Sequence, residues 1–92
     1  MNSMNRIAAY QNASAIMSFL IGTHVGTIIS LDVFPSMIQL HIHLPRKMFV
    51  VADVQKMINP YLVGSPKFSV NTLDGVQVDV LHVEWGDFDT EY

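Results

Sequence analysis

The sequence predicts an α+β domain in the order α-β-β-α-β-β, with a four-stranded antiparallel sheet and two helices packed on one face. Three observations lead to this prediction. Residues 38–44 alternate apolar and polar side chains without exception, two other segments repeat apolar residues at helical spacing, and Asp74-Gly75 separates two strand-like segments. Because each helix precedes a hairpin, one layer of helices over one sheet buries the apolar side of every element.

The first helix is expected from about Ile7 to Leu20. Its apolar stripe recurs every three or four residues and consists of Ala9, Ala13, Ile16 and Leu20. Three further apolar residues widen the stripe: Tyr10, Met17 and Ile21. We expect a helix that is apolar over so much of its circumference to pack on more than one side. Ser3 or Asn5 can cap its start, and Gly22 suits its end.

The first hairpin is expected to pair a strand from Thr27 to Val33 with the alternating segment. The earlier strand directs three apolar residues to the core: Ile29, Leu31 and Val33. The later strand directs four: Ile38, Leu40, Ile42 and Leu44. Its outward side chains are Gln39, His41 and His43. The short connection at residues 34–36 favours antiparallel pairing.

A second, shorter helix is expected between Val50 and Leu62, where apolar residues again recur at helical spacing. Asp53 lies near its first turn and Lys56 nearer its end, which agrees with the helix dipole. Pro60 ends the helix because it lacks the N–H that a further turn needs.

The second hairpin is expected to join Lys67–Leu73 to Val76–Trp85 through a type I′ turn at Asp74-Gly75. In the last strand the apolar alternation changes phase at Val80-Leu81, which predicts a β-bulge there. That bulge would direct four side chains away from the core: Gln77, Asp79, His82 and Glu84. The alternative is a strand end that is buried on both faces.

Composition indicates one small domain that associates with other chains. We divide the 92 residues into an α+β domain at 1–85 and an acidic, aromatic C-terminal tail at 86–92. Apolar residues make up 50% and charged residues 14%, against about 25% charged in a typical domain. Because a chain of this length has little interior, some apolar surface is expected to lie between subunits of a homo-oligomer.

Charge and cysteine content exclude several classes of function. The chain has no Cys, which excludes thiol catalysis and Cys-ligated metal centres and fits a cytoplasmic location. The five basic residues form no stripe, so direct nucleic-acid binding is not expected. Polar residues interrupt the charge-free stretch from Ile7 to Leu31, and no signal-peptide cleavage site follows it. We therefore expect a buried helix and no membrane association.

Two histidines of the alternating strand are candidate metal ligands. His41 and His43 lie two residues apart, on the same strand face and about 6.5–7 Å apart at their Cα atoms. His82, with Asp79 or Glu84, could complete a metal site if the two hairpins are neighbours. The alternatives are histidines exposed to solvent and histidines at an interface, which could then respond to pH.

The C-terminal tail is a candidate protein-binding segment because it alternates acids with aromatic residues. The residues proposed for this contact are Trp85, Asp87, Phe88, Asp89, Glu91 and Tyr92. The alternative is that Trp85 packs on the domain. The acids, six of which lie from Asp74 onward, could also imitate a phosphate backbone and block a basic groove.

The sequence contains no catalytic constellation. It has no G-x-S-x-G nucleophile motif and no glycine-rich phosphate loop, so neither an enzymatic activity nor a cofactor is expected. We therefore expect a non-enzymatic protein-binding protein, homo-oligomeric, with an unknown partner. The alternatives are a metal-binding domain or metal-dependent enzyme that uses the histidine face, and an acidic inhibitor of a nucleic-acid-binding protein, of the type that phages and mobile elements carry.

Overall fold

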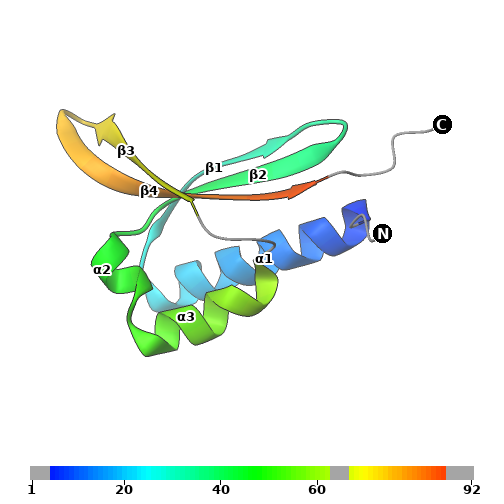
Figure 1. Cartoon of the computed structure of the whole chain (residues 1–92), viewed down its shortest axis with the longest axis horizontal. Coiled ribbons are helices and arrows are strands. Elements are labelled where there is room, and N and C mark those ends of the chain that lie inside the picture. The colour runs from blue at the N-terminus through cyan, green and yellow to red at the C-terminus, as the bar shows by residue number, and fades with distance from the viewer. Residues whose placement is uncertain (1–4, 63–66, 87–92) are drawn as a thin grey trace.

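A computed structural model describes residues 5–62 and 67–86, and the following statements concern this part of the chain. The elements are α1 (Arg6–Thr23), β1 (Thr27–Val33), β2 (Met37–His43), α2 (Arg46–Phe49), α3 (Ala52–Ile58), the 3₁₀ turn η1 (Asn59–Tyr61), β3 (Lys67–Leu73) and β4 (Val76–Gly86). The four strands form one sheet in the order β1-β2-β4-β3, and all neighbouring strands are antiparallel. Figure 1 shows α1 and α3 on the same face of this sheet, which confirms the predicted fold class.

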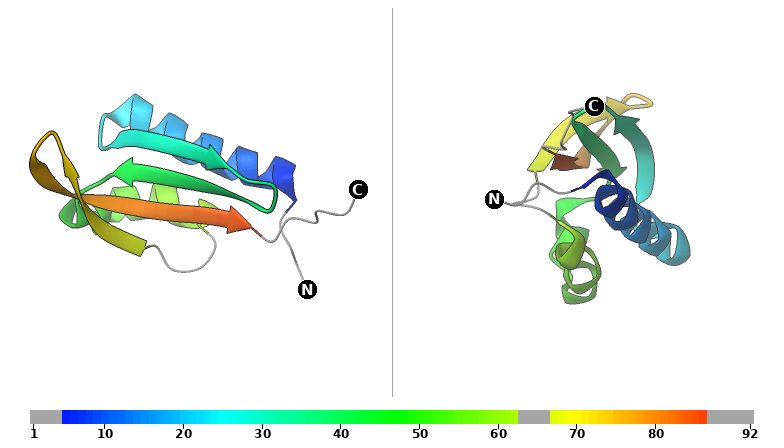
Figure 2. Two further views of the ribbon diagram at one scale, coloured as in Figure 1. Left: turned by 90° about the horizontal axis from the view of Figure 1, so that it is seen from above. Right: turned by 90° about the vertical axis from the view of Figure 1, so that its right-hand side faces the viewer.

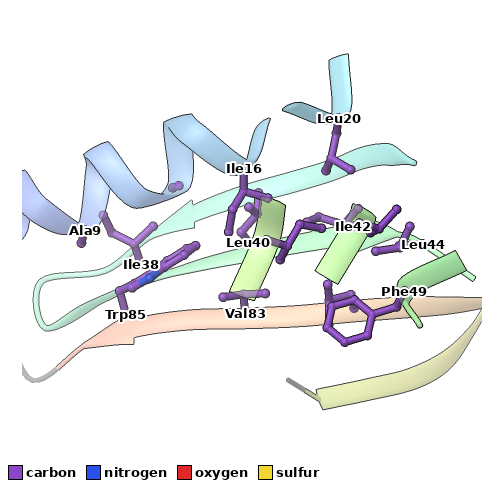
Figure 3. Packing of buried hydrophobic residues seen from close by; sticks show 14 residues of the cluster. Ala9, Ile16, Leu20, Ile38, Leu40, Ile42, Leu44, Phe49, Val83 and Trp85 are labelled. Carbon is purple, nitrogen blue, oxygen red and sulfur yellow. The ribbon is translucent and has the colours of Figure 1, made fainter. Parts of the chain in front are cut away.

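The core lies between the two helices and the central strands β2 and β4. Strand β2 alternates as predicted, because Ile38, Leu40 and Ile42 are fully buried and the polar side chains between them are half-buried. The predicted stripe of α1 is also fully buried and packs against this strand (Figure 3). Strand β4 contributes Leu81, Val83 and Trp85, and α2 contributes Phe49, whose ring packs edge to face on Phe68.

Helix α1 begins as the sequence predicts and ends later. The Asn5 side chain accepts a hydrogen bond of 2.7 Å from the N–H of Ala8, which caps the first turn. The helix continues past Gly22, and His24 adopts the left-handed conformation at its end with φ 57°. The N–H of His24 donates to the carbonyl of Leu20, which closes the last turn.

The β-bulge predicted in the last strand is wrong, because β4 pairs with β2 and β3 without a register shift. As a result Val76 and Val78 share a face with His82, and Asp79 lies on the helix side, 3.5 Å from Arg46 of α2. Val80 and Leu81 are both buried, although only Leu81 belongs to the core cluster. Burial on both faces, the alternative to a bulge, therefore holds at Val80 and Leu81, whereas His82 and Glu84 further along the outer face are half-exposed.

A register shift occurs instead in β1, between Ile28 and Ser30. It places Ile28 opposite Ile42 and leaves Ile29, which was expected in the core, 40% exposed. Val33 at the end of the same strand is 51% exposed. Because a bulge twists an edge strand, it also makes that edge less suited to pairing with another strand.

The connections follow local chemistry. The predicted second helix corresponds to α3, with Asp53 in its first turn and Lys56 in its last, as expected. Helix α2 precedes the predicted range and was not predicted from the sequence. Pro60 lies in η1, directly after α3. Asp74 and Gly75 both have positive φ, 52° and 81°, which confirms the predicted turn. Within the described ranges, no helix combines the length and hydropathy that crossing a membrane requires.

Candidate functional site

The outward-facing side of α1 is the most distinctive surface of the described chain. Its residues are Ile7, Tyr10, Gln11, Ser14, Ser18 and Ile21, which we call the outer face of α1. Ile7 is 70% exposed and Ile21 is 65% exposed. A shallow, open hollow runs along its N-terminal half. Both views in Figure 2 place α1 at the margin of the molecule, so the described chain leaves this face uncovered.

Helical spacing explains why these residues share one face. Ile7, Ser14 and Ile21 are seven residues apart, nearly two turns, so they lie almost in line along the helix. The buried stripe that contains Ala13 and Ile16 points to the other side. The sequence predicted packing on more than one side of this helix, and α1 contacts both the strands β1 and β2 and the segment formed by α3 and η1. Within the described residues its outer face remains uncovered.

The outer face of α1 carries no charge. After Arg6 the helix contains no Lys, Arg, Asp or Glu. The guanidinium of Arg6 donates from Nη1 to the carbonyl of Phe34 at 3.2 Å and from Nη2 to the carbonyl of Pro35. This positive charge is therefore held at the turn between β1 and β2. A partner that covers the outer face would not have to desolvate an ion.

The outer face of the sheet, on the side away from the helices, has a different chemistry. There His41 of β2 lies opposite His82 of β4, with ring centroids 4.6 Å apart and planes tilted by 43°. His41 Nδ1 is 3.1 Å from Ser30 Oγ and 3.3 Å from Asp32 Oδ2. His43 lies opposite Val80 on one side and Thr27 on the other. The structure thus brings together two of the three predicted histidine ligands.

Burial lowers the pKa of His82 below 6.5, and the nearby His41 and Lys67 lower this pKa further, while Glu84 opposes the shift. The Nε2 atom of His82 is shielded from solvent and has no hydrogen-bond partner among the described residues. The nearest carboxylate oxygen, Oε2 of Glu84, is 3.7 Å from it. The neutral imidazole is therefore the form that this environment favours.

This arrangement limits the chemistry that the sheet face can perform. Within residues 5–62 and 67–86, no three His, Asp or Glu side chains gather closely enough to hold a metal ion. Ser30 and Asp32 both approach Nδ1 of His41. In a Ser-His-Asp triad the serine and the aspartate contact opposite ring nitrogens, so Ser30 is not arranged as an activated nucleophile.

Trp85 does not belong to an exposed binding segment. Its side chain is fully buried, and its Nε1–H donates a 2.8 Å hydrogen bond to the carbonyl of Tyr61. The indole lies beside Ile38, its register partner on β2 (Figure 3). The prediction of Trp85 as a partner contact is therefore corrected, and its alternative, packing on the domain, holds. The other proposed contacts (Asp87, Phe88, Asp89, Glu91 and Tyr92) lie outside the described residues.

No protein-family model matches the sequence, and no curated protein or solved structure matches it either.

The outer face of α1 has a signal in the sequence, although the sequence alone does not single it out as a site. The signal was an 18-residue helix with apolar residues outside its main stripe and no charge after its first residue. Tyr10 and Ile21 widen the predicted apolar stripe, which predicts packing on more than one side of the helix and does not say what covers each side. Only the position of α1 at the margin of the molecule distinguishes burial within the chain from burial against another chain.

Proposed function

We propose that this chain is a non-enzymatic, cytoplasmic protein-binding protein that self-associates through the outer face of α1. The observation that carries the proposal is the exposure of Ile7 and Ile21, 70% and 65%, on a helix face without charge. Large exposed apolar residues that share one face are typical of protein–protein contacts, whereas isolated ones are ordinary surface features.

The energetics favour burial of this face against another protein. Fully burying one Ile side chain contributes about 1.5–3 kcal/mol. A symmetric pair of chains would bury two residues of this type from each subunit, Ile7 and Ile21, together with part of Tyr10, which is 39% exposed. The outer face has no ionised group, so little of this gain is offset by desolvation of charge.

A protein partner fits the shape and charge of this surface better than a small molecule or a lipid bilayer. Small-molecule sites are concave and enclose most of the ligand, whereas the hollow beside Ile7 and Tyr10 is open and lies on a single helix. Helices that lie on membranes carry Lys and Arg along their polar side. Here the one basic residue, Arg6, contacts the turn after β1.

Sedimentation equilibrium tests the proposal. The measurement compares the native chain with Ile21→Lys between about 5 and about 500 µM, the range in which a small apolar interface associates. The native chain should increase in average mass with concentration. Ile21→Lys should weaken association at least about tenfold, because it places an unpaired charge in the contact.

The matched control is Val50→Lys, because Val50 is 66% exposed, close to the value for Ile21, and lies outside α1. The control should associate like the native chain. A native chain that stays monomeric over the whole range would contradict the proposal, and so would equal weakening by both substitutions.

A further inference from the structure

We infer that strand β3 is a pH-sensitive element of the fold, which detaches from β4 when His82 takes up a proton. The inference concerns the sheet and does not depend on the proposed self-association through α1. It rests on two features of the structure. The first is the position of the His82 ring between neighbouring strands, and the second is the weak attachment of β3 to the rest of the domain.

The imidazole of His82 is flanked on both neighbouring strands by groups that disfavour its cation. On β2 it faces His41, whose ring centroid is 4.6 Å away, and on β3 its register partner is Lys67. Atom Nε2 of His82 is shielded from solvent and has no hydrogen-bond partner among the described residues, although 29% of the side chain is exposed. Because the cation carries a proton on both ring nitrogens, Nε2 would become a charged donor without an acceptor.

Carboxylates on this face oppose the effect only in part. Oε2 of Glu84, two residues further along β4, is 3.7 Å from Nε2 of His82, beyond hydrogen-bond distance. Asp32 of β1 contacts Nδ1 of His41 at 3.3 Å, and His43 is the next titratable side chain on this face of β2. Burial lowers the pKa of His82 most, His41 adds to this shift, and Glu84 opposes it. The folded chain therefore resists protonation of this ring.

Of the two strands beside His82, β3 is held the more weakly. Five of its seven side chains are exposed, and Phe68 and Leu73 are partly buried. Strand β2, in contrast, fully buries Ile38, Leu40 and Ile42 and pairs with a strand on each side. Detachment of β3 therefore exposes little apolar surface, whereas detachment of β2 would open the core.

Phe68 attaches the start of β3 to α2. Its ring packs edge to face on Phe49, with centroids 5.6 Å apart, and the guanidinium carbon of Arg46 lies 5.3 Å from the Phe68 centroid. Together with the ladder between β3 and β4, this contact keeps the strand in place while His82 is neutral. The detached form is therefore a minor state at neutral pH.

Detachment is coupled to proton uptake because it gives His82 access to water on the side where β3 lay. Water can accept from Nε2, which relieves the cost of the cation, so the pKa of His82 is higher in the open form than in the closed form. Acid therefore favours opening, from about pH 6.5 downward until the closed form also binds the proton. At acidic pH the edge of β4 from Val76 to His82 is thus more often without its neighbouring strand.

Amide hydrogen exchange of the full chain at low micromolar concentration tests the inference. Rates at pH 7 and pH 5 are divided by the intrinsic rate at each pH, which gives an opening constant for the protected amides of each strand. The constant for β3 should exceed that for β2 by at least about tenfold at both pH values. It should rise several-fold at pH 5, and by about 25-fold at most, the limit at which the closed form binds no proton.

Three variants assign the rise to the ring. His82→Gln should leave β3 opening more often than β2 and abolish the rise in acid, whereas the matched control His43→Gln should retain it. Glu84→Gln should enlarge the rise, because Glu84 opposes the lowering of the His82 pKa. The native chain and Glu84→Gln decide the outcome if His82→Gln does not fold.

Two kinds of result would overturn the inference. Equal opening constants for β3 and β2 would mean that the strand opens only when the whole domain unfolds. A constant for β3 that does not rise in acid, or that rises equally in His82→Gln, would mean that this ring does not control the strand. Because exchange is measured on the dilute chain, neither result bears on self-association through α1.

Discussion

The outer face of the sheet and the outer face of α1 differ in the contacts that their side chains make within the described chain. On the outer face of the sheet, His41 contacts Ser30 and Asp32, and its ring packs against that of His82. On the outer face of α1, Ile7 and Ile21 contact little and remain mostly exposed. Apart from Nε2 of His82, the polar side chains named on the sheet face thus have partners within the described chain, whereas the described residues leave Ile7 and Ile21 of the helix face mostly uncovered. This difference is the reason for proposing α1, and not the sheet face, as the interaction surface.

The largest expected effect is the difference in folding stability between a substitution on the inner side of α1 and one on its outer side. Ile16→Ala should destabilise the fold by about 2–5 kcal/mol, because Ile16 is fully buried and its truncation leaves a cavity. Ile21→Ala should change the stability of the dilute protein by less than about 0.5 kcal/mol. Urea unfolding at low micromolar concentration provides both values. A large loss in the second variant would mean that Ile21 packs within its own chain.

A smaller loss of folding stability, about 1–3 kcal/mol, is expected for Trp85→Phe. The substitution removes the hydrogen bond to the Tyr61 carbonyl and leaves part of a fully buried site unfilled. Urea unfolding measures the loss, and sedimentation of the folded variant should match that of the native chain. Weaker self-association in the folded variant would mean that Trp85 contributes to the contact between chains.

The sheet face should contribute a modest pH dependence of stability. His82 has its pKa lowered in the folded chain, by burial and by the neighbouring His41 and Lys67. The unfolded chain therefore binds a proton at a higher pH than the folded chain does. As pH falls below about 6.5, stability should decrease until the folded pKa is passed.

Urea unfolding across this pH range detects the effect. His82→Gln should flatten the pH dependence of the free energy of unfolding. The control is His43→Gln, on the same face and opposite Val80, and this variant should retain the pH dependence that His82 causes. A native chain whose stability rises as pH falls from 7 to 5 would contradict the assigned direction of the pKa shift.

The smallest effect is expected from added metal. Because no three candidate ligands gather within the described residues, Zn²⁺ at about 100 µM should raise the free energy of unfolding by less than about 0.5 kcal/mol. Thermal unfolding of metal-free protein with and without Zn²⁺ measures this change. A larger rise that His41→Gln abolishes would establish the metal site that the sequence suggested at His41, His43 and His82.

The sequence predicted the elements well because local chemistry determines them. The alternation around Leu40, the Asn5 cap and the Asp74-Gly75 turn each depend on residues close together in the chain. The main errors in the strands, the bulge assigned to Val80-Leu81 and the position of Ile29, concern register. Register depends on which strand lies alongside, and the alternation of a single strand does not contain that information.

The candidate sites were harder to predict for a related reason. The sequence identified His41 and His82 as possible neighbours, but the tilted contact of their rings follows from the pairing of β2 with β4, and so does the continuous register of β4. Trp85 ends the predicted strand and also begins the alternation of aromatic and acidic residues, so the sequence did not decide between core and contact, whereas β4 extends as far as Gly86. Exposure of Ile7 and Ile21 depends on the position of α1 at the margin of the molecule, which helical periodicity does not specify.

The most direct test of the central claim is an amide NMR dilution series from about 500 µM to about 20 µM, which spans the expected dissociation range. The account predicts concentration-dependent shifts along the outer face of α1, from Ile7 to Ile21, with no change at His41 or His82 on the sheet. Shifts confined to the sheet face, or no shifts at all, would contradict the assignment of α1 as the surface through which this protein associates.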